Sequence, residues 1–300
     1  MTSSAASSRS EKVASLASTA TDDRAGHWPL ADSTSGWRAE LALRFARRGN
    51  RSLLSSRRRS GPLMVQRPFH PEGDEVCHTY LLHPPAGIVG GDDLRVSIDV
   101  EQRAHALLTT PGATRWYFSR GIDAQSQQVL TVEDGATLEW LPQETLIFDG
   151  AHANLLTQVH LEGSARFCGW EVLGLGRPAL GEAFEQGKIV FRFEIFKDGR
   201  PVLLERQQSG AAGLPGLEGN TACATFITTN ADSLALEASR EVLSSSPDAI
   251  CASTLLGDVL VARGIAPTCE PLTDAFKKLW STLRPMTIGR AASMPRIWRT

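Results

Sequence analysis

Residues 94–101, LRVSIDVE, alternate apolar and polar side chains without interruption. Alternation with a period of two indicates a β-strand that buries one face and exposes the other. Similar alternation recurs at 136–140 and at 189–196. We therefore expect the chain from Trp37 to about Thr229 to consist mainly of half-buried β-strands.

Tight turns are indicated between these strands. Asp-Gly pairs occur at 134–135, 149–150 and 198–199, and Glu162-Gly163 adds a similar turn. Asp-Gly favours the positive φ angles that tight hairpins require. Three of the four turns lie about 13–15 residues apart, which suits short stacked strands in a sandwich, a barrel or a β-helix. No exact repeat accompanies this spacing, so spacing alone does not distinguish these folds.

Two helices are predicted near the C-terminus, at about 232–243 and 271–284. The second has the clearer pattern, with one apolar face formed by Leu272, Phe276, Leu279, Trp280 and Leu283. Pro271 suits the first turn of that helix, and Pro285 is expected to end it. An apolar stripe of this kind either packs on its own core or fills a groove on a partner.

Residues 1–33 are rich in Ser, Ala and Thr and lack the apolar run of a secretory signal. We expect a disordered tail there, followed by one β domain over 34–300. No stretch approaches the roughly 18 consecutive apolar residues of a membrane span. The five cysteines are scattered with no CxxC pair, which favours a reducing, cytoplasmic location over a disulfide framework.

Charge is distributed unevenly along the chain. The formal net charge is −2, yet the segment 38–67 contains nine Arg and one acid, Glu40. Such a segment indicates either a face that binds an acidic partner or an edge hairpin that Arg protects from aggregation. Because Phe45 is the only aromatic residue within it, a nucleic-acid surface is the weaker interpretation.

Motifs of common enzymes are absent from the sequence. The chain contains no GxxxxGK[ST] phosphate loop, no GxSxG nucleophile elbow and no HExxH zinc motif. His70, Cys77, His78 and His83 lie near one another in sequence, but their spacing matches no standard zinc site. These absences argue against nucleotide hydrolysis, serine hydrolase chemistry and a tightly bound metal.

Two acidic residues lie in strongly apolar surroundings. Glu144 occurs in WLPQETLIFDG (140–150), and Glu171 occurs in GWEVLGLGR (169–177). A buried carboxylate is costly unless it is paired, hydrogen-bonded or hydrated. Three interpretations remain open: an ion pair with Arg115 or Arg177, an acid/base pair in a β-fold hydrolase, or a hydrated interior that passes a divalent cation.

A glycine-rich turn precedes the strand at 94–101. In HPPAGIVGGDD (83–93), Pro84 restricts His83 to extended backbone, and the glycines permit positive φ angles and close backbone approach. Asp92 follows at the start of the strand, where its carboxylate is expected either to cap the turn or to line a site.

Together and in this order, these segments resemble the UreD family of urease accessory proteins, called UreH in some species. The resemblance covers Trp37 to Thr300 and also includes RRRSGPL (57–63), QRPF (66–69), CHTYLLHPP (77–85) and PRIW (295–298). Ala86 and Phe118 depart from the family pattern, which usually has Gly and a basic residue there. The resemblance implies a mainly β, single-domain fold of stacked, β-helical strands with a few helices, the main ones toward the C-terminus.

The resemblance also implies a function, that of a non-catalytic chaperone for urease. It implies direct binding of apo-urease and UreF, binding of the GTPase UreG through UreF, and no nucleic-acid or membrane partner. Nickel is then in transit, with no tightly bound cofactor. The nickel-path candidates are Asp92, Glu144, Asp149, Glu171 and His83. The partner-binding candidates are Arg57, Arg58, Arg59, Arg115, Trp116, Arg177 and Trp280. The alternative is a β-fold hydrolase that uses Glu144 and Glu171.

Overall fold

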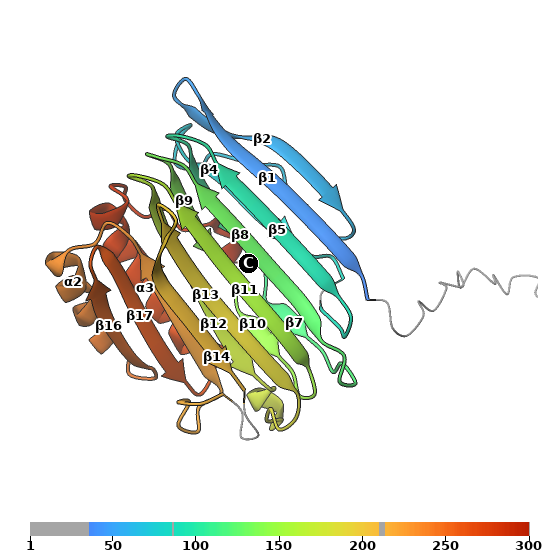
Figure 1. Ribbon diagram of the computed structural model, residues 1–300. Helices are drawn as coiled ribbons and strands as arrows, with labels where there is room; N and C mark the ends of the chain where they lie inside the picture. Colours follow the sequence, from blue (N-terminus) through green and yellow to red (C-terminus); the bar gives the residue numbers. More distant parts are fainter. Residues whose placement is uncertain (1–35, 86, 210–213, 300) are drawn as a thin grey trace, which may run out of the picture. The chain divides into compact units, whose positions relative to one another are not determined.

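A computed structural model describes residues 36–85, 87–209 and 214–299 of the protein, and the tail predicted at 1–33 lies outside them. Two β-sheets form the body of the described part (Figure 1). The seven-stranded sheet contains, from edge to edge, β14 (Arg200–Gln208), β13 (Lys188–Lys197), β11 (His152–Leu161), β8 (Ala124–Val132), β5 (Asp93–Val100), β1 (Arg38–Arg48) and β2 (Arg51–Ser60).

The second sheet has ten strands. Eight follow one another in the order β16 (Ile250–Leu256), β17 (Val259–Ala266), β15 (Ala222–Thr228), β12 (Arg166–Leu175), β9 (Thr137–Leu141), β6 (His105–Thr109), β4 (Cys77–Leu82) and β3 (Met64–Val65). Two short strands complete it: β10 (Thr145–Ile147) pairs with β12, and β7 (Thr114–Trp116) pairs with β10.

The chain alternates between the two sheets and forms a β-solenoid of about four turns. It passes from β4 to β5, from β6 to β8, from β9 to β11 and from β12 to β13, and the strands that stack within each sheet along these turns are parallel. Strands account for 49% of the described residues, so the prediction of a mainly β fold with β-helical stacking is confirmed.

Apolar side chains in register fill the space between the sheets. Ile98, Leu130, Val159 and Ile195 are aligned on β5, β8, β11 and β13, and all four are fully buried. Each strand contributes every second side chain to this interior, which is the physical basis of the period of two seen in the sequence. The interior ladders are therefore the main hydrophobic core.

Two α-helices pack on the outer face of the ten-stranded sheet, beside β16 and β17 in Figure 1. Helix α2 (Ser233–Ser244) begins after Asp232, whose carboxylate accepts a hydrogen bond from Ala235 N at 2.9 Å. Helix α3 (Cys269–Thr287) buries the apolar face expected from the sequence. Two short 3₁₀ helices, η1 (Pro178–Leu180) and η2 (Arg296–Arg299), complete the described elements. No helix among the described residues is long and apolar enough to cross a membrane.

Helix α3 does not end at Pro285, as the sequence had suggested, but continues to Thr287. Buried side-chain contacts on both sides of the proline hold the last turn in helical geometry. Arg284 donates to Glu139 before it, and the Thr287 hydroxyl donates to Leu283 O at 3.0 Å after it. Tertiary contacts thus outweigh the local tendency of proline to end a helix.

Candidate functional site

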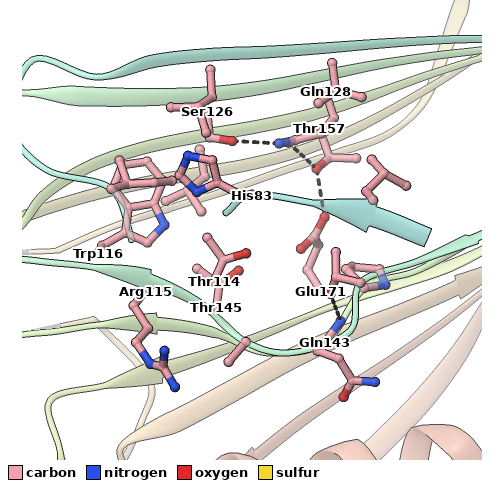
Figure 2. Close-up of a pocket in the computed structure, with 18 of the residues that line it drawn as sticks. His83, Thr114, Arg115, Trp116, Ser126, Gln128, Gln143, Thr145, Thr157 and Glu171 are labelled. Atoms are coloured by element: carbon pink, nitrogen blue, oxygen red, sulfur yellow. Dashed lines mark hydrogen bonds between the residues drawn. The ribbon is translucent and has the colours of Figure 1, made fainter. Parts of the chain in front are cut away.

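A cavity of about 270 Å³ lies inside the solenoid, between the two sheets. Its walls come from β5, β8 and β11 on one side and from β7, β9 and β12 on the other. Most of the lining is apolar, and Figure 2 shows the polar side chains that interrupt it. His83 and Trp116 lie at one side of this view and Glu171 at the other.

A row of polar side chains crosses the cavity on the seven-stranded sheet. Gln128 on β8 and Thr157 on β11 are partners in the parallel register, and the Gln128 side-chain amide donates to Ser126 Oγ at 2.7 Å. The Thr157 hydroxyl lies 3.2 Å from Gln128 Oε1 and donates to Glu171 Oε1 at 2.9 Å. The row therefore connects two turns of one sheet to a carboxylate on the other, as the dashed lines in Figure 2 show.

Glu171 lies at the inner end of this row. Trp140 Nε1 donates to its Oε1 at 3.1 Å, whereas Oε2 accepts no hydrogen bond from the described residues. Burial raises the pKa of Glu171 from 4.5 to about 7, although the hydrogen bonds from Trp140 and Thr157 act in the opposite direction. Glu171 thus presents one unshared carboxylate oxygen to the cavity in its ionised form.

His83, Arg115 and Trp116 form the other side of the cavity. Burial lowers the pKa of His83, while the charge of Asp92 opposes that effect. Trp116 is buried, and its indole N–H has no hydrogen-bond partner among the described residues. A buried donor without a protein partner is normally satisfied by water or by a ligand, so this part of the cavity is suited to hydration.

Three of the five nickel-path candidates do not line this cavity. Asp92 accepts hydrogen bonds from Trp37 N and Val89 N at 2.8 and 2.9 Å, and Asp149 accepts from two consecutive backbone N–H groups, of Glu185 and Gln186, at 2.7 Å each. Both therefore fix loop conformations. The remaining candidates, His83 and Glu171, line the cavity, and their role in a nickel path stays a prediction.

The structure corrects the interpretations placed on Glu144. Its carboxylate accepts a hydrogen bond from Thr273 of α3 at 2.9 Å and does not line the cavity with Glu171. Among the described residues Arg177 pairs with Glu182, and Arg115 forms no ion pair. Neither the expected ion pair nor the carboxylate pair of a hydrolase is therefore formed, because Glu144 turns toward the helix layer.

The partner-binding candidates divide into exposed and buried residues. Arg57, Arg58 and Arg59 are exposed on the edge strand β2, and Arg115 and Arg177 are also exposed. Trp116 and Trp280 are at most 1% exposed, so the sequence interpretation of these two as surface contacts is wrong. Trp116 forms a cavity wall, and Trp280 donates from Nε1 to Glu139 at 2.7 Å beneath α3.

Sequence reasoning did not single out Ser126, Gln128 and Thr157. A signal was present, because Ser126 and Gln128 are in phase with Leu130 and Val132, which face the interior. Polar residues at interior positions of a period-two pattern predict a polar or hydrated core. Thr157 also occupies an interior position of its strand. Its hydrogen bond to Glu171 could not be predicted from that pattern, because it depends on how the turns of the solenoid stack.

Sequence reasoning also missed a charged cluster under α3. Arg284 is fully buried and donates to Glu139 and Glu72 at distances from 2.6 to 3.2 Å. His105 Nε2 lies 2.7 Å from Glu139 Oε1, and His78 Nε2 lies 2.6 Å from Glu72 Oε1. No three His, Cys, Asp or Glu side chains in the described ranges meet in a geometry that could hold a metal ion, so the cluster is an ion-pair network.

Comparison with known proteins gives consistent matches. A family model described as UreD urease accessory protein matches residues 38–299. A urease accessory protein UreD of Azoarcus sp. (strain BH72) is 47% identical over 272 residues, covering 88% of this chain and 95% of that protein. Proteins of the same name from Dechloromonas aromatica (strain RCB) and Pseudomonas entomophila (strain L48) are 44% and 45% identical, covering 88% and 91% of this chain and 95% and 97% of theirs.

Proposed function

The chain belongs to the UreD urease accessory protein family, and from this premise we propose that it passes nickel through its interior to apo-urease. Family membership makes it an accessory protein of urease maturation rather than an enzyme. In the proposed assembly the chain binds apo-urease and UreF directly, and UreG through UreF, in the cytoplasm. The chain itself holds nickel only in transit.

The observation that carries this proposal is the Oε2 atom of Glu171, a cavity-lining residue, because this oxygen accepts no hydrogen bond from the described residues. A carboxylate oxygen, the carbonyl of Gln128 and the hydroxyl of Thr157 are oxygen ligands that a divalent cation can meet in succession. Neutral amide and hydroxyl oxygens bind such a cation more weakly than a cage of His and Cys does. The row is therefore suited to transfer rather than to storage.

The apolar remainder of the cavity supports the same proposal. Leu94, Val96, Leu155 and Phe191 line the walls beside the polar row. Apolar walls offer no competing ligands, so a hydrated cation interacts mainly with the polar row and with its own water. Passage then depends on a few side chains, which makes it sensitive to single substitutions.

The test is the nickel content of urease activated with Glu171→Gln protein at matched complex yield. The amide has nearly the volume of the carboxylate but lacks its charge, so we expect nickel loading to fall at least threefold. Glu162→Gln is the matched control, because Glu162 is an exposed acid in a turn of the same solenoid, and it should load nickel normally. Equal nickel loading with Glu171→Gln, Thr157→Val and wild-type protein would contradict passage along this row.

A further inference from the structure

We propose that four exposed apolar residues at two successive corners of the solenoid, Val89, Tyr117, Phe118 and Ile122, form a docking patch for another protein. The surface that fits this docking patch is apolar at its centre and acidic at its rim. The inference rests on the proposed role in an assembly, but it does not depend on the passage of nickel.

The docking patch is unusually apolar for a solvent-facing loop region. Val89 is 47% exposed, Tyr117 39%, Phe118 61% and Ile122 37%. Single exposed apolar residues are common, but a contiguous group that includes two aromatic rings is typical of protein interaction sites.

Backbone contacts bring together the two loops that carry these residues. The loop that carries Val89 and the loop that carries the other three are joined by hydrogen bonds from Tyr117 N to Ile88 O at 2.9 Å and from Gly91 N to Asp123 O at 3.2 Å. Asp92 fixes the first loop, because its carboxylate accepts from Val89 N. The docking patch is thus built from two successive corners of the solenoid.

Glycines hold the aromatic rings in place. A Cβ atom at Gly87 would lie 2.0 Å from the Tyr117 ring, and one at Gly150 would lie 2.1 Å from the Phe118 ring. The rings therefore rest directly on the backbone of neighbouring loops. The Tyr117 ring also packs edge-on against the Phe148 ring, with 5.3 Å between the ring centroids. Rings held in this way lose little conformational entropy on binding, which favours affinity.

The charges around the docking patch select the partner. Arg115 and Arg120 are exposed and form no ion pair with an acid in the described part of the chain. The nearby acid Asp123 is already within 3.2 Å of both Lys188 and His152. Among the charged side chains of residues 115–123, the two without an ion pair in the described part of the chain are both positive, so an acidic rim on the partner gives electrostatic complementarity.

The docking patch lies beside the cavity. Arg115 and Trp116 line the cavity immediately before Tyr117 in the chain, and Gly87, against which Tyr117 packs, follows His83 by four residues. A protein docked here lies beside the Arg115 side of the cavity. The docking patch is therefore placed where cargo would enter or leave.

The test compares Phe118→Asp and Tyr117→Asp in the full chain with Leu204→Asp and Leu234→Asp. Leu204 on β14 and Leu234 on α2 are each 62% exposed, so the controls introduce the same charge at apolar positions elsewhere that are at least as exposed. The probes are purified apo-urease and purified UreF, with Kd measured at low and high salt. We expect each docking-patch variant to weaken binding of one probe at least tenfold, and the controls to change it less than twofold. Arg120→Glu should weaken the same complex more at low salt than at high salt.

Radical footprinting of the full chain supplies an independent readout. Tyr117 and Phe118 should be labelled in the free protein and protected in the complex. Unchanged affinity for both probes overturns the proposal, as does protection in the free monomer, which would mean that the chain covers its own docking patch. Concentration-dependent protection without a partner would assign the docking patch to a second copy instead. The two proposals fail separately, because this test measures affinity whereas the Glu171 test measures nickel at matched complex yield.

Discussion

Two buried carboxylates of this protein have opposite pKa shifts. Glu171 has two neutral hydrogen-bond donors, and burial raises its pKa to about 7. Burial acts on Glu139 in the same direction, but the hydrogen bond from His105 and the charge of Arg284 lower its pKa to about 2. The imidazole of His105 and the guanidinium of Arg284 thus keep a buried acid ionised. Glu171 has neither partner and remains available to a cation that enters the cavity.

The raised pKa of Glu171 predicts a pH dependence of stability. The folded protein holds a proton on Glu171 between pH 4.5 and about 7, where the unfolded chain has released it, so stability falls as pH rises through this window. The difference corresponds to about 3 kcal/mol once both states are ionised. Glu171→Gln removes this cost, and we expect its unfolding free energy at pH 8 to exceed that of the wild type by up to about 3 kcal/mol.

Denaturant titrations between pH 5 and 8.5 check this prediction. The stability difference between the two proteins should shrink toward pH 5, because the wild-type carboxyl is then protonated in the folded state and begins to be protonated in the unfolded chain as well. Glu162→Gln is the control for removal of a surface charge and should follow the wild-type profile. A Glu171→Gln protein that is less stable than wild type at pH 8 would contradict a raised pKa of Glu171 in the folded protein.

At the scale of single elements, α3 connects the helix layer to the solenoid through charge as well as apolar contact. Arg284 lies in the last part of α3 and reaches Glu139 on β9 and Glu72 in the loop before β4. Trp280, one turn earlier, donates to the same Glu139. The end of the helix is therefore fixed to two segments that are far apart in sequence.

Replacing Arg284 by Met should destabilise the protein by about 3–5 kcal/mol, because two carboxylates would remain buried without their cation. The control is Arg290→Met, which breaks a surface pair with Glu75 and should cost less than about 1 kcal/mol. Thermal and denaturant unfolding at pH 7 measure both. An Arg284→Met protein as stable as Arg290→Met would show that the buried network contributes little.

Across the whole molecule, positive charge is concentrated in one segment of the sequence, and this segment lies at one edge of the seven-stranded sheet. The net charge of −2 includes nine Arg and one Glu between 38 and 67, and this segment forms β1 and the edge strand β2. Arg57, Arg58 and Arg59 are exposed there and form no ion pair among the described residues. Such an edge resists aggregation and attracts acidic surfaces.

Reversing two of these charges tests whether the edge acts in assembly. We expect Arg57→Glu combined with Arg59→Glu to slow association with apo-urease or UreF severalfold at low salt, with little effect at high salt. Arg200→Glu combined with Arg206→Glu is the matched control, because β14 is the opposite edge strand of the same sheet. Stopped-flow or surface binding rates give the answer, and equal rates for both double variants would leave β2 with a protective role alone.

The sequence by itself determined the β character of the chain up to about Thr229, the apolar face of α3 and the family, but it did not predict β16 and β17, which lie beyond Thr229. Period-two alternation at 94–101 and 189–196 depends only on which face each side chain takes, and that is a local property. The resemblance carried by segments such as WLPQETLIFDG was confirmed by the family match. Partners, the nickel path and the cytoplasmic location remain predictions.

Only the tertiary structure decided whether the solenoid interior or the helix layer covers a given face of a strand. Strand β9 is buried on both faces because α3 packs on the side opposite the interior, so Trp280 is core and Glu139 needs a cation. Glu144 and Glu171 look alike in sequence, yet one meets Thr273 in the helix layer and the other lines the cavity. The alternation of apolar and polar residues shows on which face of its strand a side chain lies. It does not show which residues pack against that face, because those residues come from another turn of the solenoid.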